Sequence, residues 1–74
     1  MINNRDKEIL IKFGDHLREI RLSKKISQQD LELKAEISKN QVGNIERGEV
    51  NITLITATAI AKALAIPLKD LYDY

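Results

Sequence analysis

Residues 27–48, SQQDLELKAEISKNQVGNIERG, contain two helix-start signals a short distance apart, and this stretch decides the fold. Ser27 precedes Asp30 by three residues, and its hydroxyl can accept a hydrogen bond from an unpaired amide of the first helical turn. Ser38 precedes Gln41 by three residues, which is the spacing of a capping box. The stretch therefore predicts two short helices, each opened by a serine.

Residues 35–37 separate the two predicted helices, so a tight turn must join them. The second helix is expected to end at Arg47, because the glycine that follows, Gly48, suits the left-handed position that closes a helix. Two capped short helices joined in this way have the spacing of a helix-turn-helix unit, here covering about 27–47.

The rest of the chain also shows helical periodicity, and no stretch alternates as a strand does. A first helix is predicted from Asp6 to Lys24. Its apolar stripe consists of Ile9, Leu10, Phe13, Leu17 and Ile20. Thr53 is the expected N-cap of a fourth helix. The inner face of that helix is predicted to be Leu54, Ala57, Ile60, Ala61 and Leu64. Pro67 suits the first turn of a fifth helix ending near Tyr72.

Length and composition limit what the chain can build. Its 74 residues suffice for a single domain over 1–74, and with no cysteine and one histidine, His16, it cannot form a disulfide or an ordinary structural zinc site. No apolar run approaches the roughly 20 residues that span a bilayer, and the polar start does not resemble a signal peptide. We therefore expect a cytoplasmic protein with no metal, no cofactor and no membrane partner.

Charge is spread unevenly along the chain, whose net charge is +1. Residues 1–25 carry +3, residues 26–51 carry −2, and the remainder is neutral. Attraction to nucleic acid is therefore expected to be local and modest. The acidic side chains of the first short helix and its turn, Asp30, Glu32 and Glu36, are interpreted as solvated charges. No nucleophile is paired with a base, which argues against an enzyme.

The second helix of the unit is the candidate for contact with DNA bases. Its inward positions would be Val42 and Ile45, leaving Lys39, Asn40 and Asn44 outward or at its start. Asparagine can form two hydrogen bonds with adenine, and lysine can donate to O6 and N7 of guanine in the major groove. The alternative from the residues alone is an ordinary solvated helix face.

Several short runs in fixed order carry a resemblance to a known family. They are Phe13-Gly14-Asp15-His16-Leu17-Arg18-Glu19-Ile20-Arg21, Ile26-Ser27-Gln28-Gln29-Asp30-Leu31, Ile37-Ser38, Asn44-Ile45-Glu46-Arg47-Gly48 and Leu64-Ala65-Ile66-Pro67-Leu68-Lys69-Asp70-Leu71-Tyr72. Together they resemble the phage-repressor and Cro type of helix-turn-helix protein, also called the XRE type. The resemblance implies an all-α, five-helix repressor-like domain that binds double-stranded DNA and regulates transcription, as a repressor, a controller or an antitoxin with a toxin partner.

The resemblance also implies roles for individual residues. The family contacts DNA bases at the positions of Lys39, Asn40 and Asn44. It contacts the DNA backbone at the positions of Gln28, Ser38 and Arg47, and the residue at the position of Gln28 also braces the base-contacting helix. Arg21 and Glu46 match a buried ion pair that joins the first helix to the third. A bidentate contact between guanidinium and carboxylate would fix the angle of the base-contacting helix.

Three positions depart from the family pattern. Glu32 stands where a small residue is usual, and Glu36 stands where glycine is usual because the turn needs a positive φ. A glutamate there costs about 1 kcal/mol or more unless the turn changes shape. Gly43 inside a helix costs roughly 1 kcal/mol relative to alanine. Together with the acidic residues, these departures leave open an alternative function, in which the fold is a protein-interaction module with weak or lost DNA binding.

Apolar residues on the outer side of the fourth helix predict self-association. Ile55 and Ala59 lie one helical turn apart on that side, and Tyr72 follows near the chain end. An apolar patch of this kind is typical of a surface that another subunit covers. We expect a symmetric homodimer, which would present two base-contacting helices to DNA half-sites about 34 Å apart.

Overall fold

The computed structural model describes residues 4–74 and is all-helical over that range. In chain order it contains α1 (Asn4–Ser23), α2 (Gln28–Ala35), α3 (Gln41–Glu46), α4 (Leu54–Ala63) and the 3-10 helix η1 (Leu68–Tyr72). The expected all-α helix-turn-helix architecture is confirmed, but the expectation of five α-helices is wrong in the last element. The amide of Asp70 donates to the carbonyl of Pro67, three residues back, so this five-residue segment closes as a 3-10 helix.

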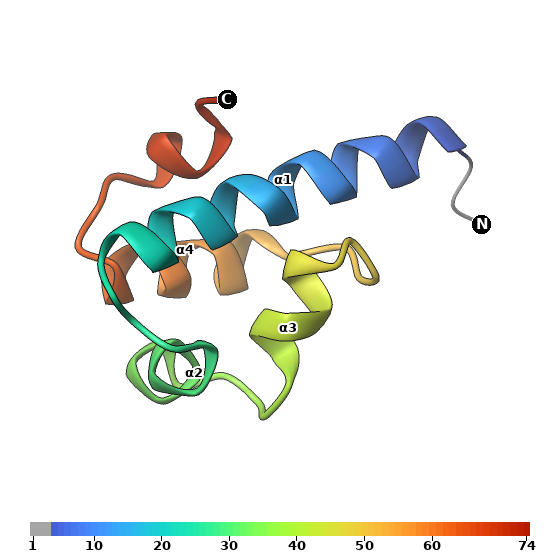
Figure 1. Ribbon diagram of the computed structural model, residues 1–74. Helices are drawn as coiled ribbons and strands as arrows, with labels where there is room; N and C mark the ends of the chain where they lie inside the picture. The colour runs from blue at the N-terminus through green and yellow to red at the C-terminus, as the bar shows by residue number, and fades with distance from the viewer. Residues whose placement is uncertain (1–3) are drawn as a thin grey trace.

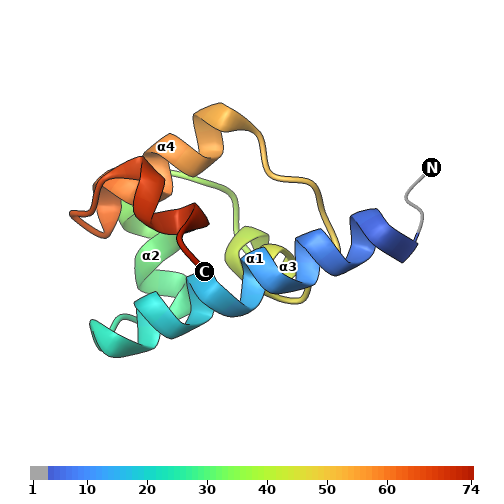
Figure 2. The ribbon, with the colours of Figure 1, turned by 90° about the horizontal axis from the view of Figure 1, so that it is seen from above.

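The long helix α1 crosses the molecule, and the shorter helices pack around its C-terminal half (Figure 1). α3 packs against α1, α2 packs against α3 and α4, and η1 contacts both α1 and α4. The first turns of α1 extend beyond the packed helices, as both ribbon views show (Figures 1 and 2). The helix-turn-helix unit therefore rests on a scaffold made of α1 and α4.

One apolar core joins all five elements. It consists of Phe13, Leu17, Leu31, Ala35, Val42, Ile45, Ala57, Ile60, Ala61, Leu64 and Leu71. Two residues predicted to be inside are exposed: Ile9 is 54% exposed and Leu54 is 68% exposed. Ile9 lies in the first part of α1, where few neighbours reach it, and Leu54 is the first residue of α4. Periodicity therefore gives the direction of a side chain but not how far the packing extends along its helix.

Left-handed residues close several of these helices. α1 ends at Ser23, one residue before the predicted end, and Lys25 follows with φ 58°. Gly48 has φ 71°, as predicted for the residue that ends α3. Glu36 has φ 56°, so the turn after α2 keeps the left-handed shape that the resemblance implies, and the glutamate carries the strain.

Between residues 4 and 74, no helix combines the length and the hydropathy that crossing a membrane requires.

Candidate nucleic-acid interface

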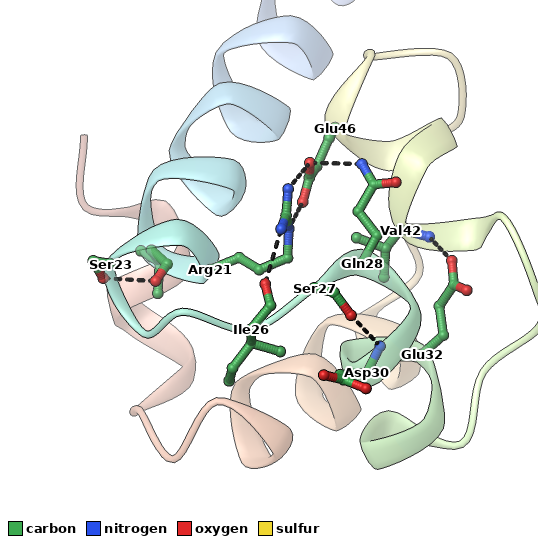
Figure 3. Close-up of polar contacts among 10 residues, drawn as sticks. Arg21, Ser23, Ile26, Ser27, Gln28, Asp30, Glu32, Val42 and Glu46 are labelled. Atoms are coloured by element: carbon green, nitrogen blue, oxygen red, sulfur yellow. Dashed lines mark hydrogen bonds and ion pairs between the residues drawn. The ribbon is translucent and has the colours of Figure 1, made fainter.

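α2 begins at the predicted cap. The Ser27 hydroxyl accepts a hydrogen bond from the amide of Asp30 at 3.0 Å, with Ser27 in an extended conformation (Figure 3). This bond fixes the first residue of α2 at Gln28, whose side chain then lies at the open N-terminal end of the helix. Free amides and the helix dipole at such an end favour an anion such as a DNA phosphate.

A buried polar network ties α1 to the helix-turn-helix unit. Arg21 Nε donates to Glu46 Oε2 at 2.7 Å, and its Nη2 donates to Glu46 Oε1 at 3.0 Å. Arg21 Nη1 also donates to the carbonyl of Ile26 at 2.9 Å (Figure 3). The hydrogen bond from Arg21 to Glu46 raises the pKa of the guanidinium above its ordinary value. The contact expected between these two residues is therefore present and bidentate, and it fixes the end of α3 against α1.

Gln28 joins the same network. Its Nε2 donates to Glu46 Oε1 at 3.0 Å, although the residue itself is exposed (Figure 3). The resemblance assigns Gln28 to the DNA backbone and to bracing the base-contacting helix. The structure places its side chain between α2 and α3, where it is positioned to brace α3.

Gly14 allows α1 and α3 to approach closely. A Cβ atom built on Gly14 would lie 2.6 Å from the carbonyl oxygen of Glu46 and would overlap the carbonyl of Ile45. These are backbone atoms, which cannot rotate away. The absence of a side chain at Gly14 therefore permits the contact that positions the C-terminal end of α3.

The start of α3 differs from the sequence prediction. α3 begins at Gln41 rather than directly after Ser38, and its N-cap residue is Asn40, with φ 70° and no side-chain capping bond. The predicted capping box at Ser38 is therefore wrong. Glu32 supplies the bond instead: its Oε2 accepts from the amide of Val42 at 3.0 Å (Figure 3).

Glu32 is consequently not the solvated charge that the sequence suggested. The residue is 7% exposed, and its carboxylate reaches from α2 to the first turn of α3. A carboxylate at a helix N-terminus is stabilised by the free amide and by the helix dipole. The departure from the usual small residue was visible in the sequence. Its consequence was not, because the capping bond spans ten residues and belongs to no local pattern.

The exposed surface between α2 and α3 is hollowed into a depression of ≈ 570 Å³, called here the α2–α3 depression. Its lining residues are Gln28, Gln29, Glu32, Lys39, Asn40, Gly43, Asn44 and Arg47. Five of the six residues predicted to contact DNA lie in this lining. The sixth, Ser38, is exposed in the turn before α3. The structure therefore gathers the predicted contacts from two helices onto one surface.

Arg47 and Asn44 contact each other at the edge of the depression. Arg47 Nη2 donates to Asn44 Oδ1 at 2.6 Å, and Arg47 Nε donates to Glu49 Oε2 at 2.8 Å. A guanidinium has no acceptor, so the amide oxygen of Asn44 faces Arg47 and its NH2 group is left to point elsewhere. The hydrogen bond to Glu49 raises the pKa of Arg47 and lowers the pKa of Glu49. The sequence counted Glu49 among the acidic residues that favour the protein-interaction alternative, but it did not predict the contact with Arg47, because Glu49 lies in the loop beyond the helix that the pattern defines.

The surface offers no grouping typical of a metal centre. Within the described part of the chain, His, Asp and Glu side chains form no group of three or more that could hold a metal ion. The depression instead combines two cations, Lys39 and Arg47, with amide groups and the N-terminal end of α2, beside the Glu32 carboxylate that caps α3. Such a set can donate hydrogen bonds to phosphates and to base edges.

Comparison with known proteins shows the family to which the chain that carries this surface belongs. Residues 17–71 match the helix-turn-helix family. The chain belongs to that family. The control protein C.BamHI of Bacillus amyloliquefaciens is 39% identical over 75 residues, spanning 100% of this chain and 88% of that protein. The crystal structure of the restriction-modification controller protein C.AhdI from Aeromonas hydrophila has a TM-score of 0.85 and 38% identity, covering 86% of this chain and 97% of that one.

These relatives decide between the two functions that the sequence left open. One is named a control protein and the other a restriction-modification controller protein, and the matched family region includes α2, the turn, α3 and α4. The protein is a helix-turn-helix transcription regulator of the XRE type, as the resemblance implied. The alternative, an interaction module that has lost DNA binding, is not favoured.

Proposed function

We propose that the protein controls a restriction–modification operon by binding double-stranded DNA through the α2–α3 depression and the outward residues of α3. The convergence of the predicted DNA contacts on one exposed surface is the observation that carries the proposal. The two similar controller proteins favour a controller over an antitoxin or a phage-type repressor. We place the protein in the cytoplasm, where its DNA would be, and treat residues 1–74 as one helix-turn-helix domain.

In this proposal α3 lies in the major groove, and its N-terminal end points at the bases. Lys39 and Asn40 stand immediately before the helix, and Asn44 stands one turn into it. All three side chains line the depression. Base edges of the major groove that lie against the depression would therefore contact the three side chains at the same time. Gln28, Ser38 and Arg47 flank them and are assigned to phosphates, which set the orientation of the protein on the duplex.

Selection of bound sites from a random duplex pool, followed by titration of variants, tests the proposal. Asn44→Ala should cost about 1–3 kcal/mol on the selected site and relax the preference at one base pair, because its amide contacts a base edge. Asn51→Ala removes an equally polar, exposed side chain from the loop before α4 and should change neither. Equal losses from Asn44→Ala on all duplexes would show that Asn44 does not contact bases.

We also infer that the protein acts as a homodimer. Ile55 is 83% exposed on α4, and the neighbouring Leu54 is 68% exposed. Ala59 is half-buried and packs on the core, while Tyr72 is 49% exposed and lies 5.2 Å from Phe13 between ring centroids. Ile55, with Leu54, is therefore the strongest candidate for the centre of a subunit contact, and Ala59 and Tyr72 would lie towards its edge.

A further inference from the structure

Two groups compete for the guanidinium of Arg47. In the proposed complex it contacts a DNA phosphate. In the free protein, its Nε donates to Glu49 Oε2 at 2.8 Å, and its Nη2 donates to Glu49 Oε1 at 3.4 Å. The two side chains are 56% and 55% exposed, so both are accessible to solvent. Arg47 lines the α2–α3 depression, and Glu49 is bound to it at the edge of that depression. Nη2 also donates to Asn44 Oδ1 at 2.6 Å. The edge of the guanidinium formed by Nε and Nη2, which suits a bidentate acceptor, is thus already engaged.

We propose that Glu49 is an affinity-limiting residue whose carboxylate competes with DNA phosphate for Arg47. This inference rests on the proposed function. Carboxylate and phosphate oxygens accept hydrogen bonds from arginine in the same bidentate manner, so one can replace the other. A phosphate that approaches Arg47 must either displace Glu49 or share the guanidinium with a like charge. In both cases the carboxylate weakens the contact without regard to the base sequence.

Glu49 is ionised at neutral pH, as an ordinary glutamate is, and its surroundings favour the charged form further. The hydrogen bond from Arg47 lowers the pKa of the carboxyl group, and the nearby charges of Arg47 and Lys7 lower it further. The competing charge is therefore present under the conditions in which the protein binds DNA. Lys7 belongs to α1 and Glu49 to the loop after α3, so positive charge from α1 also acts on this carboxylate.

The test compares charge-matched variants of the full chain on two duplexes, the selected site and an unrelated sequence. Glu49→Gln removes the competing charge but keeps an oxygen that can accept from Arg47. Glu19→Gln, on the exposed side of α1, removes the same charge away from the depression. Dissociation constants are measured between about 50 and 200 mM salt, where phosphate contacts show their salt dependence.

We expect Glu49→Gln to bind both duplexes about fivefold more tightly than the wild type at low salt, which is the upper range for an exposed charge pair. The gain in affinity should shrink as salt screens the interaction, and Glu19→Gln should give a smaller gain in affinity than Glu49→Gln. In an Arg47→Ala background, which should itself flatten the salt dependence by about one unit of slope, the gain from Glu49→Gln should fall to that of Glu19→Gln.

Three outcomes would overturn the inference while leaving the proposed function intact. They are wild-type affinity for Glu49→Gln, a gain no larger than that of Glu19→Gln, and a gain that is undiminished without Arg47. A wild-type protein that binds neither the selected site nor the unrelated duplex would instead overturn the proposed function itself. Circular dichroism of each variant verifies that the helical fold is retained, so a change in affinity can be assigned to the surface.

Discussion

At the scale of single residues, Glu32 is the side chain on which the start of α3 most depends. α3 has six residues, and its N-cap Asn40 offers no side-chain bond, so the bond from Val42 to Glu32 is the cap that the structure provides. Glu32→Ala should lower the free energy of unfolding by about 1–2 kcal/mol, because a buried amide loses a charged acceptor. Glu32→Gln should cost less, since its amide oxygen can still accept. Urea denaturation followed by circular dichroism measures both.

The control for this prediction is Glu36→Gln. It removes the same charge four residues later, from a side chain that is exposed. Its effect should stay within about 0.5 kcal/mol, as is usual for surface substitutions. If Glu32→Ala proves as stable as Glu36→Gln, the capping role of Glu32 is refuted.

Glu32 and Ser38 also show why the candidate site was only partly predictable. A local signal, such as Ser27 three residues before Asp30, involves atoms whose separation is set by the helix itself, and it was predicted correctly. Ser38 carries the same local signal, yet a buried carboxylate from α2 takes the capping position. Which residue caps α3, a neighbour in the chain or a side chain from another helix, depends on how the helices pack. The sequence of one segment carries no information on that packing.

At the scale of elements, two helical glycines should respond oppositely to the same substitution. Gly14→Ala places a methyl group against the backbone of Glu46 and would force α1 away from α3. We expect this substitution to destabilise the protein by about 1–3 kcal/mol. A methyl group at Gly43 would meet Arg47 Nη1 at 3.0 Å and Gln28 Oε1 at 3.3 Å, which are ends of exposed, flexible side chains. Gly43→Ala should therefore raise stability by up to about 1 kcal/mol through helix propensity.

Thermal and urea unfolding of the two alanine variants test this contrast, and each variant serves as the control for the other. A Gly14→Ala variant as stable as the wild type would show that the close approach of α1 to α3 does not depend on Gly14, and a destabilised Gly43→Ala would refute the expectation for Gly43. If Gly43→Ala is more stable but binds DNA less tightly, Gly43 is retained to leave room for Arg47 and Gln28 at the depression.

Element boundaries followed from the sequence where the predicted cap or left-handed glycine formed, and not at Ser38, where the cap did not form. Ser27, Thr53 and Gly48 all act as predicted, with the Thr53 hydroxyl accepting from Thr56 at 3.1 Å. The inward direction of α4 was likewise correct for Ala57 and Ile60. The exposure of Leu54 and Ile9 was missed, because it depends on where neighbouring helices stop and not on the period of the helix that carries them.

At the scale of the whole molecule, the charge distribution requires an explanation. The net charge is +1, and the segment that contains α2 and α3 is net acidic, so one copy presents few cations to DNA. Two copies joined by a two-fold axis would present two depressions to neighbouring half-sites. Their modest affinities would then combine through effective concentration. Self-association is therefore the feature that would reconcile weak local charge with useful affinity.

The test of this idea is the oligomeric state of Ile55→Asp. An aspartate at a side chain that is 83% exposed leaves the monomer core untouched, but it would place an unpaired charge in the proposed contact between α4 helices. Leu33→Asp is the matched control, since Leu33 is 73% exposed on α2 and outside that contact. In sedimentation experiments, the wild type and Leu33→Asp should dimerise and Ile55→Asp should remain monomeric. A wild-type monomer at high micromolar concentration, on DNA as well as off it, would refute the dimer. An Ile55→Asp variant that dimerises as well as the parent would move the contact elsewhere on the surface.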